Sequence, residues 1–208
     1  RRQRQMCIRD RDYTIHWLKN DNMRFIRTIQ AFFIVVLSMI YLPFLTRKKV
    51  SLIKEDFYHL CKWQNFQFNL FTFYLCFASI KQFRSVVYRR LGKCRFLTCG
   101  ILKGMECLYI CTTDIGGGLI IQHGFSTIIN AKKIGKNCKI FQQVTIGYNG
   151  DEQPIIGDNV VVCCGAKIIG GVKVGNNVII GANAVVCKDI PDNVVVAGVP
   201  AKIIKYIE

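Results

Sequence analysis

An aliphatic residue returns at a nearly constant interval through the second half of this 208-residue chain. A new unit begins at Ile115, Ile121, Ile128, Ile134, Ile140, Ile146, Ile156, Val162, Ile168, Val174, Ile180 and Val186. Every interval is six residues except two, of seven residues (Ile121 to Ile128) and ten residues (Ile146 to Ile156). A period of six matches neither an α-helix nor a single strand, but it fits a chain that turns a corner after each short strand.

Turn-forming and small residues recur at fixed places within these units. The second position is often glycine, which tolerates a positive φ in a tight turn: Gly116, Gly135, Gly147, Gly157, Gly175 and Gly181. The fifth position is often small or β-branched: Val144, Val160, Ala166, Val172, Val178 and Ala184. Asparagines suit left-handed turn positions: Asn137, Asn159, Asn176, Asn177 and Asn183. With three strands per coil, the twelve units predict a parallel β-helix of about four coils over residues 105–208.

The two irregular intervals indicate where this β-helix departs from its plain coil. The ten-residue interval contains Gly, Asn, Asp and Pro, so residues 147–155 are predicted to form a loop that projects from one corner, often the binding face of a solenoid. The seven-residue interval contains His123, in a bulge that can re-aim a side chain. A polar corner residue of a solenoid also needs no function, so spacing alone does not assign one.

The first half of the chain predicts helices. Residues 51–104 are rich in aromatic residues, and a set of cations follows at helical spacing with an apolar counterface: Lys81, Arg84, Arg89, Arg90 and Lys93. We favour an interpretation in which this face packs against other parts of the protein. A basic amphipathic face also fits a peripheral contact with an anionic membrane.

Residues 1–50 form a separate N-terminal segment. Its first eleven residues contain five Arg and one Asp without an initiating Met, and they resemble translated adapter sequence, which would place the native start at Met6, Met23 or Met39. The apolar run 29–45 is at the lower length limit for a bilayer span. It fits a buried helix, a membrane-surface helix, or upstream sequence outside the native protein.

The net charge of +16 belongs almost entirely to the first half of the chain. Residues 1–105 contain 20 Lys and Arg against 5 Asp and Glu, whereas residues 106–208 contain 9 against 8. We therefore expect no nucleic-acid partner. The 11 cysteines include no CxxC pair, and adjacent Cys163 and Cys164 are poorly placed for a metal. This usage favours reduced thiols in a cytoplasmic protein, without a bound metal.

The repeats and the closing residues 197–202 resemble the hexapeptide-repeat acyltransferases, which fold as left-handed parallel β-helices. Two segments, 118–124 and 144–154, are most similar to the serine acetyltransferases. The resemblance implies an O-acetyltransferase with acetyl-CoA as co-substrate, in which an acceptor hydroxyl attacks the thioester directly. It also implies a homotrimer, or a dimer of trimers, with active sites between neighbouring subunits.

The same resemblance assigns His123 as the general base. Imidazole titrates near neutral pH and accepts the proton of a hydroxyl, and direct attack requires no cysteine nucleophile. Of the nearby carboxylates Glu106 and Asp114, we choose Glu106 as the acidic partner. The other histidines, His16 and His59, lie in the N-terminal segment and in a predicted helix, and we assign neither to the site.

The residues expected to face the acceptor are Gln122, Gly124 and Gln153. The serine acetyltransferases have Asp where this chain has Gln122, and His where it has Gln153. A zwitterionic amino acid needs opposite charges around it, whereas two amides suit a neutral polyol. The family favours serine, and a sugar hydroxyl, as in capsular polysaccharide, is the alternative. An inactive β-helix scaffold is a second alternative.

The resemblance places CoA along the outer edge of the coils. Two pairs of small residues, sixteen positions apart, would let the pantetheine approach the backbone: Gly165–Ala166 and Gly181–Ala182. Lys202 would meet a CoA phosphate.

Overall fold

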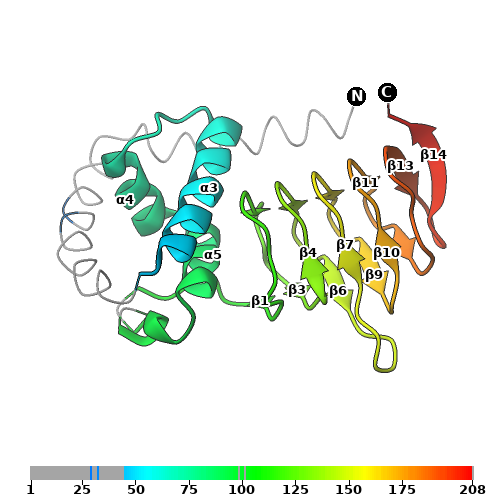
Figure 1. Ribbon diagram of the computed structural model, residues 1–208, viewed down its shortest axis with the longest axis horizontal. Coiled ribbons are helices and arrows are strands. Elements are labelled where there is room, and N and C mark those ends of the chain that lie inside the picture. The colour runs from blue at the N-terminus through cyan, green and yellow to red at the C-terminus, as the bar shows by residue number, and fades with distance from the viewer. Residues whose placement is uncertain (1–28, 30–31, 33–44, 98, 101, 208) are drawn as a thin grey trace.

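The computed structural model describes residues 45–97, 99–100 and 102–207, together with Ile29 and Phe32. Most of the apolar run 29–45 therefore lies outside the described residues. From residue 45 the chain forms three α-helices and then a parallel β-solenoid, with the helices stacked against one end of the coils (Figure 1). None of the helices in this part of the chain is both long and apolar enough to cross a bilayer.

The helices are α3 (Arg47–Gln64), α4 (Leu70–Ser79), α5 (Lys81–Leu91) and the short 3-10 helix η2 (Gly92–Leu97). Two of them begin at a polar cap, since Thr46 accepts the Lys49 N–H at 3.3 Å and Asn69 accepts the Thr72 N–H at 2.8 Å. Helix α3 ends at Asn65, which adopts the left-handed conformation with a φ of 59°. The helical prediction for this region is confirmed.

An aromatic core holds the three helices together. Phe57 of α3 lies 5.2 Å from Phe73 of α4 and 5.9 Å from Phe83 of α5, measured between ring centroids. Phe77 and Tyr88 meet edge to face at 5.7 Å in the same cluster. The aromatic residues that marked this region in the sequence therefore form the core of a small helical unit.

Fourteen strands follow, in three sheets. The five-stranded sheet contains β1 (Leu108–Ile110), β3 (Thr127–Ile129), β6 (Thr145–Gly147), β9 (Lys167–Ile169) and β12 (Val185–Val186). The three-stranded sheet contains β4 (Lys133–Ile134), β7 (Ile155–Ile156) and β10 (Lys173–Val174). The six-stranded sheet contains β2 (Ile120–Ile121), β5 (Lys139–Ile140), β8 (Val161–Val162), β11 (Ile179–Ile180), β13 (Val194–Ala197) and β14 (Lys202–Tyr206). All strands pair in parallel except β13 with β14.

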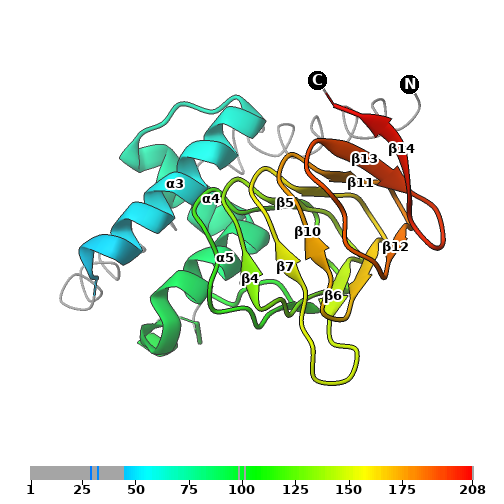
Figure 2. The ribbon, with the colours of Figure 1, turned by 45° about the vertical axis from the view of Figure 1, so that its right-hand side comes forward.

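The chain visits the sheets in a fixed order, five-stranded, three-stranded, six-stranded, and winds in the left-handed sense (Figure 2). Isolated bridges at Ile115 and Ile190 add one more position at each end of the three-stranded sheet, so the solenoid has five coils. The sequence predicted about four. The difference arises because β1 precedes the first repeat unit and the last coil, through Ile190 and β13, no longer keeps the spacing of six.

The register after His123 also differs from the prediction. Ile129, which is fully buried, pairs with Ile146, whereas Ile128 pairs with Thr145 and is 42% exposed. The interval between core residues around His123 is therefore eight residues, from Ile121 to Ile129, and not the seven predicted from Ile128. A shift of one residue moves a side chain to the opposite face of a strand, which is why Ile128 lies outside the core.

The corner between the three-stranded and six-stranded sheets carries an asparagine ladder. Asn137, Asn159, Asn177 and Asn193 all have φ near +55°, and their side chains bond one to the next at 2.8–3.0 Å. Asn176, also predicted to be left-handed, instead accepts the Asp158 N–H through its side chain at 2.8 Å. The ladder fixes this corner in successive coils.

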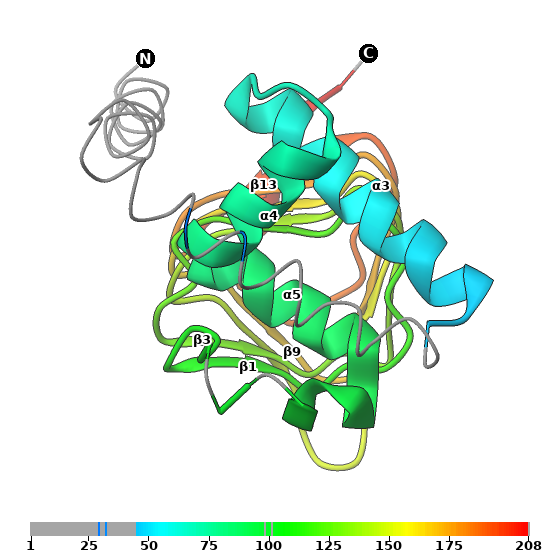
Figure 3. The same cartoon turned by 90° about the vertical axis from the view of Figure 1, so that its left-hand side faces the viewer.

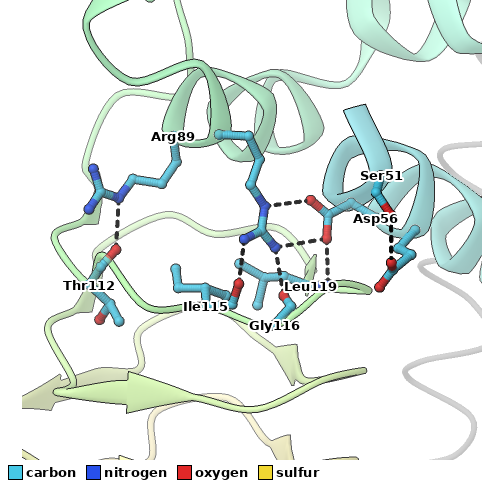
Figure 4. Close-up of polar contacts among 9 residues, drawn as sticks. Ser51, Asp56, Arg89, Thr112, Ile115, Gly116 and Leu119 are labelled. Atoms are coloured by element: carbon cyan, nitrogen blue, oxygen red, sulfur yellow. Dashed lines mark hydrogen bonds and ion pairs between the residues drawn. The ribbon is translucent and has the colours of Figure 1, made fainter. Parts of the chain in front are cut away.

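The helices cover the open end of the solenoid, where α5 crosses the mouth of the first coil (Figure 3). Arg90 donates to the carbonyls of Ile115 and Gly116, both at 2.6 Å, and pairs with Asp56 at 2.9 Å. Asp56 in turn accepts the Leu119 N–H at 2.9 Å (Figure 4). Because the first coil has no preceding coil to bond with, these helical side chains satisfy its backbone groups.

Candidate active site

His123 lies at the corner between β2 and β3, in the coil that the helices cover. Its backbone is left-handed, with a φ of 62°, and Gly124 follows with a φ of 67°. The Gln122 N–H bonds to the Ile140 carbonyl at 2.8 Å, and the Gly124 N–H bonds back to the Gln122 carbonyl at 2.8 Å. The predicted bulge is therefore a tight turn that leaves the imidazole half-buried at the end of the solenoid.

Side chains from the helices reach this corner. The Trp63 indole N–H donates to Gln122 Oε1 at 3.3 Å, and Gln122 Nε2 lies 3.4 Å from His123 Nε2. Gln82 of α5 donates to the His123 carbonyl at 2.9 Å, and the Lys139 ammonium lies over the Trp63 ring. Neither Trp63 nor Gln82 was predicted to belong to the site, because each lies too far along the chain from its partner for the local sequence to show the contact, at separations of 59 and 41 positions.

Gln122 is 8% exposed, with its amide between an indole and an imidazole. Gly124 is buried, and an added Cβ there would lie 2.9 Å from Ile121 and 3.3 Å from the Met105 sulfur. The corner therefore has no space for a larger residue after His123.

The chain before β1 also approaches this corner. The Thr127 N–H bonds to the Cys107 carbonyl at 3.0 Å, and Met105 lies against Gly124. Glu106 is exposed between these two contacts, so it is on the same side of the molecule as His123. Asp114 is exposed at the next corner of the first coil. The choice of Glu106 as acidic partner stays a prediction.

Gln153 lies at a different corner, between the five-stranded and three-stranded sheets. It donates to Asn130 Oδ1 at 3.0 Å, which ties the loop of residues 147–155 to the coil before it. The loop turns back on itself through a bridge between Asn149 and Glu152. His123 and Gln153 therefore flank the five-stranded sheet from opposite sides, and one chain does not bring them together.

The corner of His123 continues along the whole solenoid as an edge between the six-stranded and five-stranded sheets. We call it the His123 edge; it comprises residues 122–126, 141–144, 163–166, 181–184 and 198–201. Consecutive corners bond to one another, Gln143 N–H to Phe125 carbonyl (3.0 Å), Gly165 N–H to Gln142 carbonyl (3.0 Å) and Asn183 N–H to Cys164 carbonyl (2.9 Å).

The residues predicted to contact CoA lie on or next to this edge. Gly165 has a φ of 73°, and an added Cβ would collide with the Asn183 side chain. Gly181 packs against Ala197, and Ala182 is half-buried beside it. Lys202 begins β14 directly after the last corner and is exposed. Ala166 is the exception in orientation, since its side chain is fully buried among the aliphatic residues of the core.

The thiol of Cys138 is not available as a nucleophile, because the core of the solenoid encloses it. Cys138 is 1% exposed inside the solenoid, and its Sγ lies 3.2 Å from the Gly157 carbonyl. Burial raises the pKa of this thiol to about 12, so it stays protonated and unreactive at neutral pH. Within the part of the chain that the structure describes, no three His, Cys, Asp or Glu side chains gather as a metal site would require.

Comparison with known proteins agrees with this architecture. The family model for the bacterial transferase hexapeptide (six repeats) matches residues 153–188, which form β7 to β12. A serine acetyltransferase of Staphylococcus aureus is 44% identical over 96 residues, which are 44% of this chain and 45% of that protein. The chain thus matches less than half the length of this relative.

Solved structures show the same fold over a longer part of the chain. A serine acetyltransferase of Neisseria gonorrhoeae superposes with a TM-score of 0.62 at 22% identity, covering 78% of this chain and 67% of that one. A serine acetyltransferase of Brucella abortus in complex with coenzyme A superposes with a TM-score of 0.58 at 22% identity, covering 86% and 74%. The predicted fold, a helical region followed along the chain by a hexapeptide-repeat β-helix, is confirmed.

Proposed function

We propose that this chain, whose solenoid carries the hexapeptide repeat of bacterial transferases, is an acetyltransferase that moves the acetyl group of acetyl-CoA to an acceptor hydroxyl. The repeat in residues 153–188 and the 44% identity to a serine acetyltransferase of S. aureus support this assignment. The observation that carries it is the His123 edge, which holds a half-buried imidazole at one end and small residues and a lysine further along.

In this proposal His123 is the general base. Its neutral imidazole accepts the proton of the acceptor hydroxyl, and the oxygen attacks the thioester carbonyl. The tetrahedral intermediate, whose oxyanion a backbone N–H stabilises, then collapses. The departing CoA sulfur takes this proton from the imidazolium and leaves as a thiol. The chemistry therefore needs no covalent enzyme intermediate.

CoA would lie along the His123 edge, with its thioester at His123. Three coil spacings of about 4.8 Å separate the corner of His123 from the corner of Gly181, which gives an extended path of roughly 14 Å. The glycines at 165 and 181 allow the pantetheine to approach the backbone. Lys202, exposed at the far end, would pair with a CoA phosphate.

The acceptor site would be completed by a second copy of the chain. His123 and Gln153 lie at opposite corners of the five-stranded sheet, so a closed ring of copies would bring the His123 corner of one chain to the Gln153 loop of its neighbour. A trimer, alone or doubled, is the assembly we propose. Glu106 is proposed as the acidic partner of His123.

Two acceptor chemistries follow from different observations. The named relatives favour serine. The side chains favour a neutral acceptor, because positions 122 and 153 are both amides, which donate and accept hydrogen bonds but hold no charge for an ammonium or a carboxylate. A sugar hydroxyl is therefore the second candidate.

A thiol-release assay with acetyl-CoA tests the proposal and separates the two acceptors. The full chain is given L-serine in one arm and simple sugars in the other, and free CoA is measured over time. We expect acceptor-dependent release of CoA. Faster release with serine would reject the sugar acceptor, and faster release with sugars would reject serine. If no hydroxyl acceptor supports release, the chain is a scaffold and the proposed activity is wrong.

A further inference from the structure

The basic face predicted on α5 is used inside the protein. Arg84, Arg89 and Arg90 donate to backbone carbonyls of the helical unit and of the first coil. Arg90 also pairs with Asp56 at 2.9 Å. These three arginines are buried or half-buried, which leaves Lys81 as the exposed cation of α5. The arginines of α5 therefore hold the helices to the solenoid and are not available to an external partner.

Helix α3 carries a second basic face, and this face is exposed. The helix lies on the outside of the helical unit (Figure 2). Its buried residues lie on one side, and most of its exposed residues recur at intervals of three or four on the other side. We call this exposed side the α3 face; it comprises Arg47, Lys48, Ser51, Lys54, Glu55, Tyr58 and Lys62.

The α3 face has an excess of positive charge. It holds four cations and one carboxylate, Glu55, which accepts the Ser51 hydroxyl at 3.2 Å. Among the residues that the structure describes, none of the four cations forms an ion pair. Their charges are therefore available to an anionic partner.

Apolar side chains extend the α3 face at its C-terminal end. Phe68, Leu70 and Phe71 are exposed where the chain passes from α3 into α4, Leu70 at 70% and Phe71 at 55%. Tyr58 meets Phe68 edge to face at 5.8 Å between ring centroids, so the apolar group is continuous with the basic one. A contiguous exposed apolar group of this kind marks a surface that meets a partner.

The chemistry of this surface favours an anionic lipid bilayer as the partner. Its cations attract anionic headgroups, whereas they would repel the same face of a second copy of the chain. Leu70 gains from insertion beside acyl chains, and an aliphatic side chain does not provide the aromatic platform on which a nucleic-acid base stacks. Three consecutive cations, residues 47–49, also follow closely after the apolar run 29–45. Cations beside an apolar segment are typical of proteins held at an anionic membrane surface.

We propose that the α3 face, together with Phe68, Leu70 and Phe71, binds the surface of an anionic membrane. The cations contact headgroup phosphates, and Leu70 and Phe71 insert at the boundary with the acyl chains. This surface differs from the basic face predicted from the sequence, because the arginines of α5 are used inside the protein. The proposal does not depend on the transfer of acetyl groups.

Co-sedimentation of the full chain with lipid vesicles tests the proposal. One set of vesicles is phosphatidylcholine alone, and the other is phosphatidylcholine and phosphatidylglycerol in equal amounts. We expect binding to the anionic vesicles that weakens as added salt screens the charges. Lys54→Glu combined with Lys62→Glu should lower the partition coefficient about twentyfold or more, because two attracting charges are reversed. Leu70→Ser combined with Phe71→Ser should lower it about tenfold or more, since less apolar surface is inserted.

Lys133→Glu combined with Lys173→Glu is the charge-matched control and should leave more of the binding intact. Both lysines are exposed on the three-stranded sheet of the solenoid and not on the helical unit. The circular dichroism spectrum of each variant checks that the chain is folded, which we expect because every changed side chain is exposed.

Four results would overturn the proposal. Equal binding to both kinds of vesicle would assign the contact to apolar segments without the cations. An equal loss in the control would assign it to net charge and not to the α3 face. Unchanged binding in both α3-face variants, or no binding of the wild-type chain to anionic vesicles, would reject the surface. If labelled single-stranded RNA binds in place of the vesicles and the α3-face variants abolish that binding, the surface belongs to a nucleic-acid partner instead.

Discussion

Left-handed backbone conformations gather around the histidine of the candidate site. Most of the non-glycine residues with positive φ are asparagines, which tolerate this region. Among the described residues four are not: His123, Ser126 and Gln143 lie on the His123 edge, and Cys107 accepts the N–H of Thr127, the residue that follows its first corner. Such residues cost stability and persist where the surrounding structure holds them, a pattern typical of functional sites.

The sequence could single out His123 as a candidate, but not the side chains that reach it from the helices. A break in the period of six and the resemblance of segment 118–124 to the serine acetyltransferases both pointed to His123. The one-residue error at Ile128 arose because two adjacent isoleucines satisfy the pattern equally well, and only the pairing of Ile129 with Ile146 decides between them. Trp63 and Gln82 come from helices that the fold, and not the local sequence, brings to the corner.

At the scale of elements, the helical unit caps the end of the solenoid through a small set of polar contacts. Arg90 and Asp56 form an ion pair in which both side chains are almost fully buried, and together they bond to three backbone groups of the first coil. Burial raises the pKa of Asp56, against the opposing effect of the Arg90 charge. The helices are therefore part of the folded β-helix and not an appendage to it.

Asp56→Ala should destabilise the chain strongly. The change leaves the Arg90 charge buried without its partner and the Leu119 N–H without an acceptor, so we expect a loss of about 3–5 kcal/mol in the free energy of unfolding. Urea unfolding followed by circular dichroism measures this loss. Ser51→Ala, which removes an exposed hydrogen bond to Glu55 on the same helix, is the control and should change stability by less than about 0.5 kcal/mol. Equal stability of the two variants would show that the cap contributes little.

The packing of the helices against the first coil could not be predicted from the sequence. Asp56 and Arg90 are 34 residues apart, and their backbone partners lie further along the chain, so no local pattern records the contact. The repeat, by contrast, is visible because each unit meets the same environment as the unit one coil away. The first and last coils break the period because each has a neighbour on one side only.

At the scale of the whole molecule, the proposed site is incomplete in one chain. His123 and the Gln153 loop lie at opposite corners of the five-stranded sheet, and exposed apolar residues lie on that sheet between them, including Tyr109 and Ile128. Light scattering of the purified chain should therefore return three or six times the chain mass of 23.8 kDa. A particle with the mass of one chain would reject an acceptor site shared between copies.

The central claim is that His123 removes the proton of the acceptor hydroxyl, and the rate of CoA release in His123→Asn tests it most directly. Asparagine tolerates the left-handed turn at this position, so the variant removes the imidazole while keeping the corner. We predict a fall in kcat of about 10²- to 10⁴-fold, as for loss of a general base, with an unchanged circular dichroism spectrum. A folded His123→Asn variant that releases CoA at the wild-type rate would contradict the account.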